Sequence, residues 1–206
     1  ECLILESLYA DYDIETPSEE DVKNEILDIF SKLDTTNKTI ITSTFSSHIV
    51  RLKTLVDTGQ KLGRKVCLLG RSLNTHSSIA RELNITDLKS GTTIVSRFEE
   101  INNLLENVYA DRDKYFLICT GHQGEEFSVL SRILDNWFDF SFSKDDIMLF
   151  SSSVIPTEQN QASFSELEAK MRKKGLNIIK DVHASGHAGL KDHKKIPIEE
   201  RNSEEL

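Results

Sequence analysis

The pattern that decides the fold is clearest in the stretch Tyr115-Phe116-Leu117-Ile118-Cys119-Thr120-Gly121-His122-Gln123-Gly124. Its first half is apolar on both sides of an extended chain, which predicts a strand that is buried on both faces. The small and polar residues of its second half end the strand, because such residues favour turns. The same unit, an apolar run followed by small polar residues, recurs along the chain.

Apolar strands alternate with amphipathic helices over most of the sequence. The predicted strands cover residues 1–6, 39–43, 65–70, 92–95, 115–120, 147–151 and 176–182. Between them, apolar side chains recur at spacings of three and four residues, which predicts helices over 19–33, 49–62, 75–83, 101–108, 127–134 and 164–171. This alternation is typical of a mostly parallel sheet flanked by helices, so we expect a three-layer α/β domain of the Rossmann or flavodoxin type.

Length and composition favour one domain with a substantial core. The chain has 206 residues and 38% apolar content, and no stretch approaches the roughly 18 apolar residues of a membrane span. We therefore expect a cytoplasmic protein. The three cysteines, Cys2, Cys67 and Cys119, lie in or beside apolar strand-like runs without close spacing, which favours buried thiols over disulfides or a zinc site.

The acidity of the chain does not exclude a nucleic-acid partner. The net charge is −9, and residues 1–34 hold eleven acids against two lysines, so the remaining residues are neutral in sum. A local cationic groove is compatible with this distribution.

Small polar clusters follow the predicted strands. They are 6–7, 43–47, 70–72, 120–124, 151–153 and 183–187. Because ligands of parallel sheets bind at the carboxyl ends of the strands, we expect these clusters to converge on one phosphate-lined rim. Neither GxxxxGK[ST] nor GxGxxG occurs, which counts against the common nucleotide-binding loops.

The densest group of chemically active side chains is Ile179-Lys180-Asp181-Val182-His183-Ala184-Ser185-Gly186-His187-Ala188-Gly189. Glycine permits close approach of a ligand, a serine hydroxyl can donate to an oxyanion, and imidazole titrates near neutrality, which together suit phosphate binding. A polar turn in which the two histidines make only local hydrogen bonds is the alternative. A metal cluster with His193 is disfavoured, because Gly186 and Gly189 argue against a regular helix.

In chain order, six motifs resemble those of the β-CASP family of metallo-β-lactamase-fold nucleases. They are Leu5-Glu6-Ser7, Thr44-Phe45-Ser46-Ser47-His48, Gly70-Arg71-Ser72, Thr120-Gly121-His122-Gln123-Gly124-Glu125, Ser151-Ser152-Ser153-Val154-Ile155-Pro156 and His183-Ala184-Ser185-Gly186-His187. Within that family, the chain is most similar to the ribonuclease J group, in its archaeal form. The resemblance covers residues 1–195 as a β-CASP domain and leaves 196–206 as a polar tail or linker.

This resemblance implies a role in RNA processing and decay. In the family, the β-CASP domain is inserted in a metallo-β-lactamase domain, and RNA passes through the cleft between them. We therefore expect the RNA-binding portion of a zinc-dependent ribonuclease that hydrolyses phosphodiesters, with RNA and the metallo-β-lactamase domain as partners and a homodimer of the full-length enzyme. The metal-binding motif HxHxDH is absent here, so we expect this chain alone to hold no zinc and to be inactive.

The resemblance also assigns roles to individual residues. Glu6 and His187 match catalytic motif positions. The positions matched to substrate-phosphate binding are His183, Ser185, Gly186, Ser46, Ser47, Arg51 and Arg71.

From the residues alone, other interpretations stay open. Glu6 could be a helix-capping or sheet-edge acid, and Arg51 and Arg71 could be ordinary solvated charges. The alternative function is a free-standing doubly wound domain that binds a nucleotide or a protein partner without catalysis.

Overall fold

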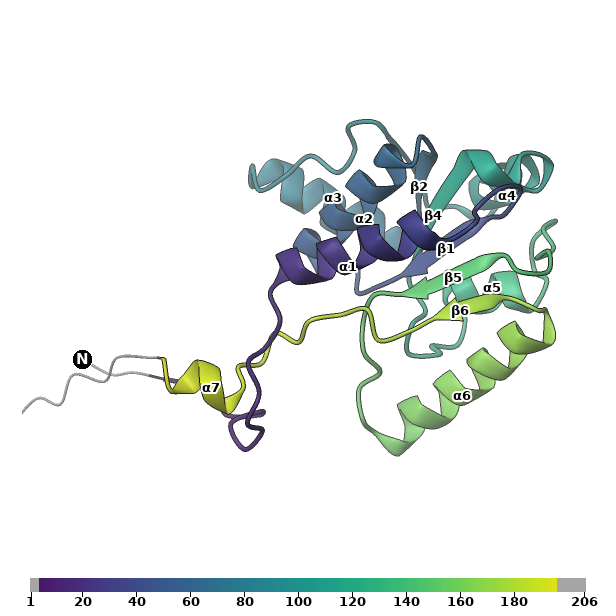
Figure 1. The fold of residues 1–206 in the computed structure, drawn as a ribbon. Helices are drawn as coiled ribbons and strands as arrows, with labels where there is room; N and C mark the ends of the chain where they lie inside the picture. Colours follow the sequence, from purple (N-terminus) through teal and green to yellow (C-terminus); the bar gives the residue numbers. More distant parts are fainter. Residues whose placement is uncertain (1–3, 196–206) are drawn as a thin grey trace, which may run out of the picture.

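The computed structural model describes residues 4–195, which contain one six-stranded sheet (Figure 1). Its order is β3-β2-β4-β1-β5-β6, and all neighbouring strands pair in parallel. The strands are β1 (Ile40–Ser43), β2 (Lys65–Leu69), β3 (Thr92–Val95), β4 (Tyr115–Cys119), β5 (Ile147–Phe150) and β6 (Asn177–Ile179). The central strand β1 lies between β4 and β5, with Ile41 opposite Leu117 and Met148. The predicted α/β sheet is confirmed.

Helices cover both faces of this sheet. On one face lie α1 (Glu19–Lys32), α2 (Ile49–Lys61) and α3 (Arg71–Glu82), and on the other lie α4 (Phe98–Ala110), α5 (Val129–Leu134) and α6 (Glu158–Lys173). A 3-10 turn (Arg112–Lys114) precedes β4, and a short helix α7 (Leu190–His193) follows β6. Successive strand residues divide between the two cores: Ile40 packs with α1 and α2, whereas Ile41 packs with α4, α5 and α6. This alternation produces the three layers.

The helix and strand boundaries follow local chemistry. The predicted capping box is present at the start of α1, where the Ser18 hydroxyl accepts from the Asp21 N–H and the Asp21 carboxylate accepts from the Ser18 N–H. Helix α3 begins at Arg71, earlier than the predicted residue 75. Strand β6 ends at Ile179 instead of 182, and the positive φ of Asp181 turns the chain shortly after it.

Two of the three cysteines are buried thiols, as expected. Cys67 and Cys119 are free, and burial raises the pKa of their thiols to about 11 and about 12 respectively. Neither thiol is therefore ionised near neutral pH. Cys2 lies outside the described residues.

The prediction of a buried strand over residues 1–6 is wrong for the part that the structure describes. Residues 4–6 have no strand pairing, and Ile4 and Leu5 are 89% and 47% exposed. Their apolar side chains produced the prediction, but no sheet edge of the described chain lies beside them. Residues 1–3 and the predicted tail 196–206 lie outside the described residues.

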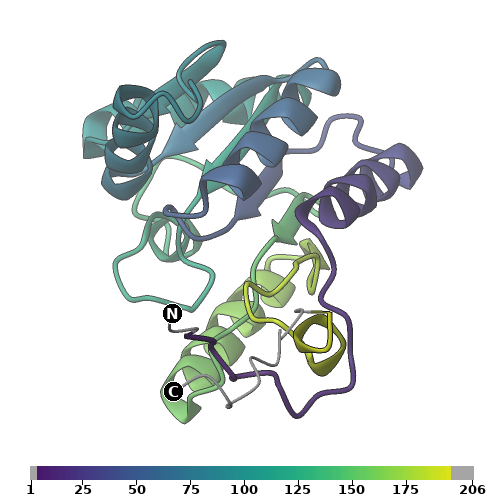
Figure 2. The ribbon, with the colours of Figure 1, turned by 90° about the vertical axis from the view of Figure 1, so that its left-hand side faces the viewer.

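The N-terminal segment instead runs beside the segment around α7, away from the sheet (Figures 1 and 2). Tyr9 forms a parallel bridge with Gly189, and the carbonyls of Tyr12 and Ile14 accept from the N–H groups of Leu190 and Lys191. We call residues 6–16 together with 187–195 the stem. It joins two segments that are remote in the sequence.

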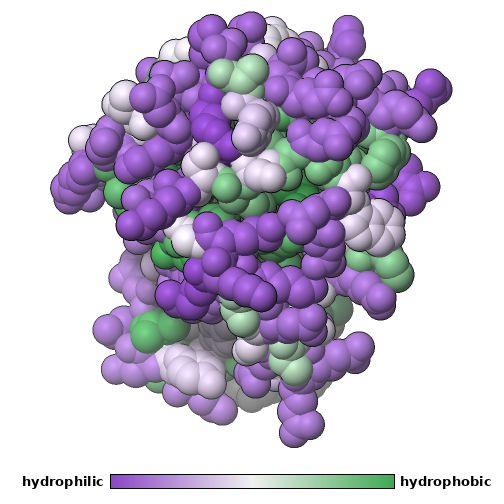
Figure 3. Space-filling view, turned by 90° about the vertical axis from the view of Figure 1, so that its right-hand side faces the viewer, coloured by the Kyte–Doolittle hydropathy of each residue, from purple (hydrophilic) through white to green (hydrophobic). Residues whose placement is uncertain are grey.

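The surface on the side opposite the stem is mainly hydrophilic, with apolar atoms showing between polar side chains (Figure 3). Among the described helices, none is both long and apolar enough to cross a bilayer.

Gly59 makes a close helix-to-sheet contact that predicts a stability effect. A Cβ at this position of α2 would lie 2.6 Å from Cγ2 of Val66 and 2.8 Å from Cγ of Phe116. We expect Gly59→Ala to lower the free energy of unfolding by about 1–3 kcal/mol, because overpacking outweighs the better helix propensity of alanine. Urea denaturation measures this. The control Gln60→Ala, at an exposed position of the same helix, should change stability little, and equal stability of both variants would contradict the packing argument.

Candidate functional site

A hollow of about 610 Å³ lies at the carboxyl ends of β1, β5 and β6. Four segments line it, and we call it the histidine hollow. They contribute Leu8, Tyr9 and Tyr12 from the stem, Phe45 and His48 after β1, residues 151–153 with Ile155 and Pro156 after β5, and residues 183–187 after β6. Three of the polar clusters predicted to meet therefore line one cavity, as expected at the carboxyl edge of a parallel sheet.

A buried arginine holds three of these segments together. The side chain of Arg51 in α2 is fully buried, and its guanidinium pairs in a bidentate manner with Glu19, at 3.0 Å from Nε to Oε2 and 2.8 Å from Nη2 to Oε1. Its Nη1 donates to the carbonyl of Ser151 at 2.9 Å, the hydroxyl of Ser151 at 2.8 Å and the carbonyl of Val182 at 3.3 Å. The hydroxyl of Ser151 in turn donates to the carbonyl of Val182. This network fixes the backbone that directly precedes His183.

The expectation that Arg51 contacts a substrate phosphate is therefore corrected. The guanidinium is covered by protein, its nitrogens already donate to Glu19, Ser151 and Val182, and it is not among the residues that line the histidine hollow. A signal was present in the sequence, because Arg51 lies one helical turn before the buried Leu55 and so shares its face. Arg51 is a positioning residue of the site.

The stem brings Glu6 and His187 together across 181 positions of the sequence. The Glu6 carboxylate accepts from the N–H of Leu8 and of Ala188, and it lies 3.3 Å from Nδ1 of His187. These backbone donors lower the pKa of Glu6, because they stabilise its charged form. The ring of Tyr9 lies against that of His187, with 5.4 Å between the centroids. A carboxylate only accepts, so Nδ1 carries the proton in this contact and Nε2 remains available.

His183 and Ser185 lie on the wall of the same hollow. Burial and the positive charge of Arg51 lower the pKa of His183, because both favour the neutral ring. The Ser185 hydroxyl accepts from the N–H of His187, and Gly186 between them is exposed, with open space where a Cβ would lie. Backbone and side-chain donors are thus close together at this turn.

The other predicted phosphate ligands are placed differently. Ser46 and Ser47 lie in the turn between Phe45 and His48, but their own side chains are not part of the wall of the histidine hollow. Arg71 is exposed and lines a different cavity, at the ends of β2, β3 and β4. The predicted single rim is therefore divided into two hollows.

An aromatic pair lies between these hollows. The ring of Phe45, which lines the histidine hollow, packs edge-on against the buried ring of His122, with 4.0 Å between the centroids. His122 follows Thr120 and Gly121, and Thr120 lines the other cavity. Burial lowers the pKa of His122, in keeping with two ring nitrogens that have no hydrogen-bond partner among the described residues.

The predicted site residues did not include His48, Tyr9 or Tyr12, which also line the histidine hollow. His48 lies 3.4 Å from a carboxylate oxygen of Glu19, and burial and the neighbouring Arg51 lower its pKa. His48 follows Ser47 directly in a recognised motif, so its position could have been found. The two tyrosines had no such signal, because only the pairing of the stem brings them to the hollow.

The described residues do not fit a zinc ion. Within residues 4–195, no group of three histidine, cysteine, aspartate or glutamate side chains is arranged to hold a metal. His183, His187 and His193 therefore do not form the metal cluster considered from their spacing.

Comparison with known proteins shows the family to which the chain belongs. The β-CASP domain of ribonuclease J matches residues 37–166. The chain belongs to this family. It is 35% identical to ribonuclease J of Methanocaldococcus jannaschii over 94% of its length, and 36% identical to ribonuclease J of Pyrococcus abyssi over 93%. Ribonuclease J 1 of Streptococcus pyogenes is 30% identical over 94% of the chain.

The recognised resemblance to archaeal ribonuclease J is thereby confirmed. The β-CASP chain spans 43% and 42% of the lengths of the two archaeal relatives and 33% of the streptococcal one. Its family is that of RNA-processing ribonucleases. The residues matched by the β-CASP family include strands β1 to β5 and the loops between them.

The network around Arg51 predicts a large loss of stability on truncation. Arg51→Ala leaves the partly buried carboxylate of Glu19 without its bidentate partner and removes one of the donors to the carbonyls of Ser151 and Val182, so we expect a loss of about 3 kcal/mol in the free energy of unfolding. Chemical denaturation measures it. Arg81→Ala, at the exposed end of α3, is the matched control and should change stability by less than about 0.5 kcal/mol. A small loss for Arg51→Ala would contradict a structural role for this residue.

The histidine environments predict a dependence of stability on pH. The pKa values of His48, His122 and His183 are lowered in the folded protein, whereas an unfolded histidine has a pKa of about 6.5. Below about pH 6.5 the unfolded chain binds more protons, so the free energy of unfolding should fall as the pH falls from 7.5 to about 5. Urea denaturation across this range tests it. His183→Gln should reduce the dependence, and a stability that is constant over the range would contradict the burial argument.

Proposed function

We propose that the histidine hollow binds the 5′-phosphorylated end of an RNA within a metal-dependent ribonuclease. The observation that carries this proposal is the meeting of Glu6 and His187 at the mouth of a cavity that also contains His183 and Ser185. The proposal thus combines hydrogen-bond donors for an anion, from His183 and Ser185, with the imidazole of His187, which the carboxylate of Glu6 orients.

The turn over residues 183–187 supplies the anion-binding half of the proposal. His183 offers a ring N–H, Ser185 a hydroxyl, and Gly186 an exposed backbone that a ligand can approach closely. Tyr9, Tyr12 and Phe45 line the same cavity, and their rings suit contact with the terminal nucleobase. A terminal phosphate and its base would therefore occupy different parts of the hollow.

The pair of Glu6 and His187 supplies the reactive half. Because Glu6 holds Nδ1, the ring of His187 is oriented with Nε2 free to bind a phosphoryl oxygen, and a doubly protonated ring could donate a proton to it. In the complete enzyme we expect this contact to be made with the reacting phosphodiester.

The metal and its activated water belong, in this proposal, to a metallo-β-lactamase domain. The exposed apolar side chains of Ile4, Leu5 and Leu8 at the start of the described chain are suited to packing against that domain. We propose that the stem is the connection through which the two domains form an RNA-binding cleft.

The anion-binding half predicts a preference for RNA with a 5′-monophosphate over RNA with a 5′-hydroxyl. Replacing both His183 and Ser185 by alanine should reduce this preference by about tenfold, since charge-assisted hydrogen bonds to the phosphate are lost. Fluorescence anisotropy with the two forms of one labelled oligonucleotide measures it. His76→Ala, on α3 away from the hollow, is the control, and an unchanged preference in the double variant would refute the assignment.

The reactive half is tested in the full-length ribonuclease that contains this domain. His187→Ala should lower kcat far more than it raises KM, because its proposed contact is to the reacting phosphate. A rise in KM with unchanged kcat would instead assign His187 to substrate binding alone.

A further inference from the structure

The second cavity of the rim, about 280 Å³ in volume, has a lining that suits a nucleic-acid strand. It lies where the chain leaves β2, β3 and β4, and we call it the arginine hollow. Arg71 and Arg132 supply cationic groups, Ser72 and Ser128 supply hydroxyls, and Phe98 and Phe127 supply aromatic faces. No carboxylate is found among the described residues that line it.

The two phenylalanines that line this hollow, Phe98 and Phe127, are exposed to solvent. Phe127 is 56% exposed and has a φ of +62°, a left-handed conformation that is strained for a bulky side chain. Phe98 on the other wall is 43% exposed and stacks on Phe138 at a centroid distance of 4.8 Å, which fixes its orientation. The chain thus holds two rings at the surface instead of burying them.

Arg132 connects this wall to the only tryptophan of the chain. Its guanidinium carbon lies 5.3 Å from the ring centroid of Trp137, which is 49% exposed, and its buried Nε has no hydrogen-bond partner among the described residues. The ring of Phe127 lies 6.1 Å from that of Trp137. The guanidinium therefore retains donors for a ligand.

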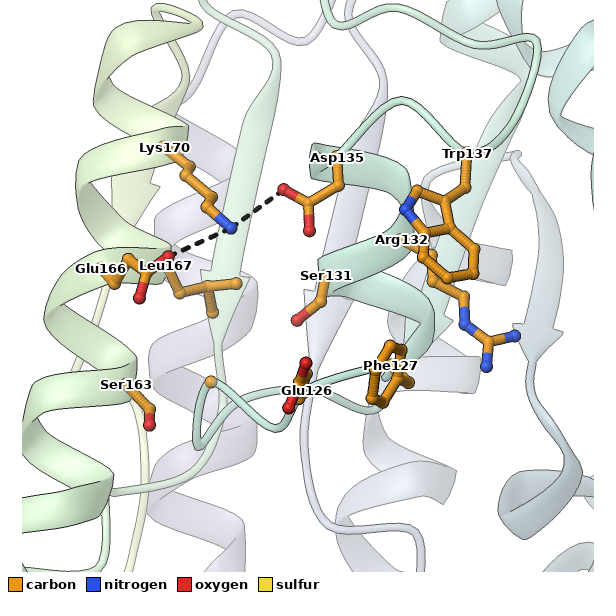
Figure 4. Close-up of a pocket in the computed structure, with 11 residues that line it drawn as sticks. Glu126, Phe127, Ser131, Arg132, Asp135, Trp137, Ser163, Glu166, Leu167 and Lys170 are labelled. Atoms are coloured by element: carbon orange, nitrogen blue, oxygen red, sulfur yellow. Dashed lines mark ion pairs between the residues drawn. The ribbon is translucent and has the colours of Figure 1, made fainter.

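The cavity on the other side of Phe127 and Arg132 has the opposite character. Glu126, Asp135 and Glu166 line it. Lys170 forms ion pairs with Asp135 at 2.9 Å and with Glu166 at 3.3 Å (Figure 4). Figure 4 shows the guanidinium of Arg132 pointing away from this pair of acids. A phosphate is thus disfavoured on the acidic side and favoured in the arginine hollow.

We propose that the arginine hollow is a second binding site for single-stranded RNA, in which a nucleobase stacks on Phe127 and the phosphates of the strand contact Arg71 and Arg132. The ligand class rests on the proposed function, because both hollows then bind one strand. Single-stranded RNA fits this lining since its bases stack on exposed rings while arginines hold its backbone.

The position of the hollow on the rim supports this assignment. It shares the carboxyl edge of the sheet with the histidine hollow, and the ring of Phe45 after β1, which lines the histidine hollow, packs against His122 in the loop after β4, which also contributes Thr120 to the arginine hollow. A strand whose 5′ end lies in the histidine hollow could therefore continue along the same edge.

The test compares 5′-phosphorylated oligouridylates of about 4 and about 12 nucleotides, lengths that span common single-strand site sizes. In Phe127→Asn, asparagine tolerates the left-handed backbone, so the loop keeps its shape while the ring is lost. We expect Phe127→Asn and Arg132→Gln to weaken binding of the longer oligonucleotide by about tenfold and to leave the shorter one unchanged. Arg132→Gln should also reduce the salt slope of log K by about 0.7, the value for one contact to a single strand.

Two control variants and the fluorescence of Trp137 complete the experiment. Tyr109→Ala and Arg81→Gln lie at the far ends of α4 and α3 from the hollow and should bind both oligonucleotides as the wild type does. Fluorescence of Trp137 should change on addition of the longer oligonucleotide only.

The outcomes separate this proposal from the proposed function. If the wild type prefers a 5′-phosphate but Phe127→Asn and Arg132→Gln behave like the controls, the arginine hollow is not an RNA site and is open to a different partner, while the histidine hollow keeps its assignment. If the wild type binds neither oligonucleotide, both proposals fail.

Discussion

The geometry of the histidine hollow depends on one buried charge, the guanidinium of Arg51. It links the start of α1 through Glu19, the residue after β5 through Ser151, and the segment after β6 through Val182. A buried ion pair is a weak source of net stability, because desolvation offsets much of the attraction, but it is specific about geometry. Here the hydrogen bond from Arg51 fixes the position of Val182, the residue directly before His183. The same charge lowers the pKa of His183 and of His48, so the anchor also sets the electrostatics of the hollow.

The two hollows follow from the winding of the chain. After β1 and β2 the chain enters α2 and α3 on one face of the sheet, whereas after β4 and β5 it enters α5 and α6 on the other. Neighbouring strands therefore send their loops in opposite directions, which opens crevices at the carboxyl edge. Side chains then decide what each crevice can hold: histidines and tyrosines in one, arginines and phenylalanines in the other.

Much of the fold could be predicted because the strands at the centre of a parallel sheet, covered on both faces, are mainly apolar, as in β2, β4 and β5. Strand β3 was predicted with its observed bounds, and β4 to within a residue. Helix α3 was predicted too short, since its first turn, which begins with Arg71 and Ser72, has little apolar periodicity. Of the strand expected at residues 1–6, the described residues 4–6 form no strand, because an apolar side chain indicates burial but does not indicate which element it packs against.

The site was less predictable than the fold. Spacing alone could not bring Glu6 to His187; the motifs shared with a known family assigned both residues to catalytic positions, and the structure shows that they meet. Arg51 was misassigned because a positive charge suggests a phosphate ligand, whereas its helical face determines that it points inward. Phe127 was expected on the helix over 127–134, but α5 begins at Val129, and Trp137 carried no signal in the sequence. Exposure of an aromatic side chain depends on a backbone angle and on neighbours that no local pattern reveals.

The most direct measurement is a crystal structure of this chain with a short 5′-monophosphorylated RNA. The account predicts that the terminal phosphate contacts His183, Ser185 and the backbone at Gly186, while Arg51 keeps its bonds to Glu19, Ser151 and Val182. A phosphate bound directly by Arg51, with its pairing to Glu19 broken, would contradict the separation of anchor from ligand on which the account rests.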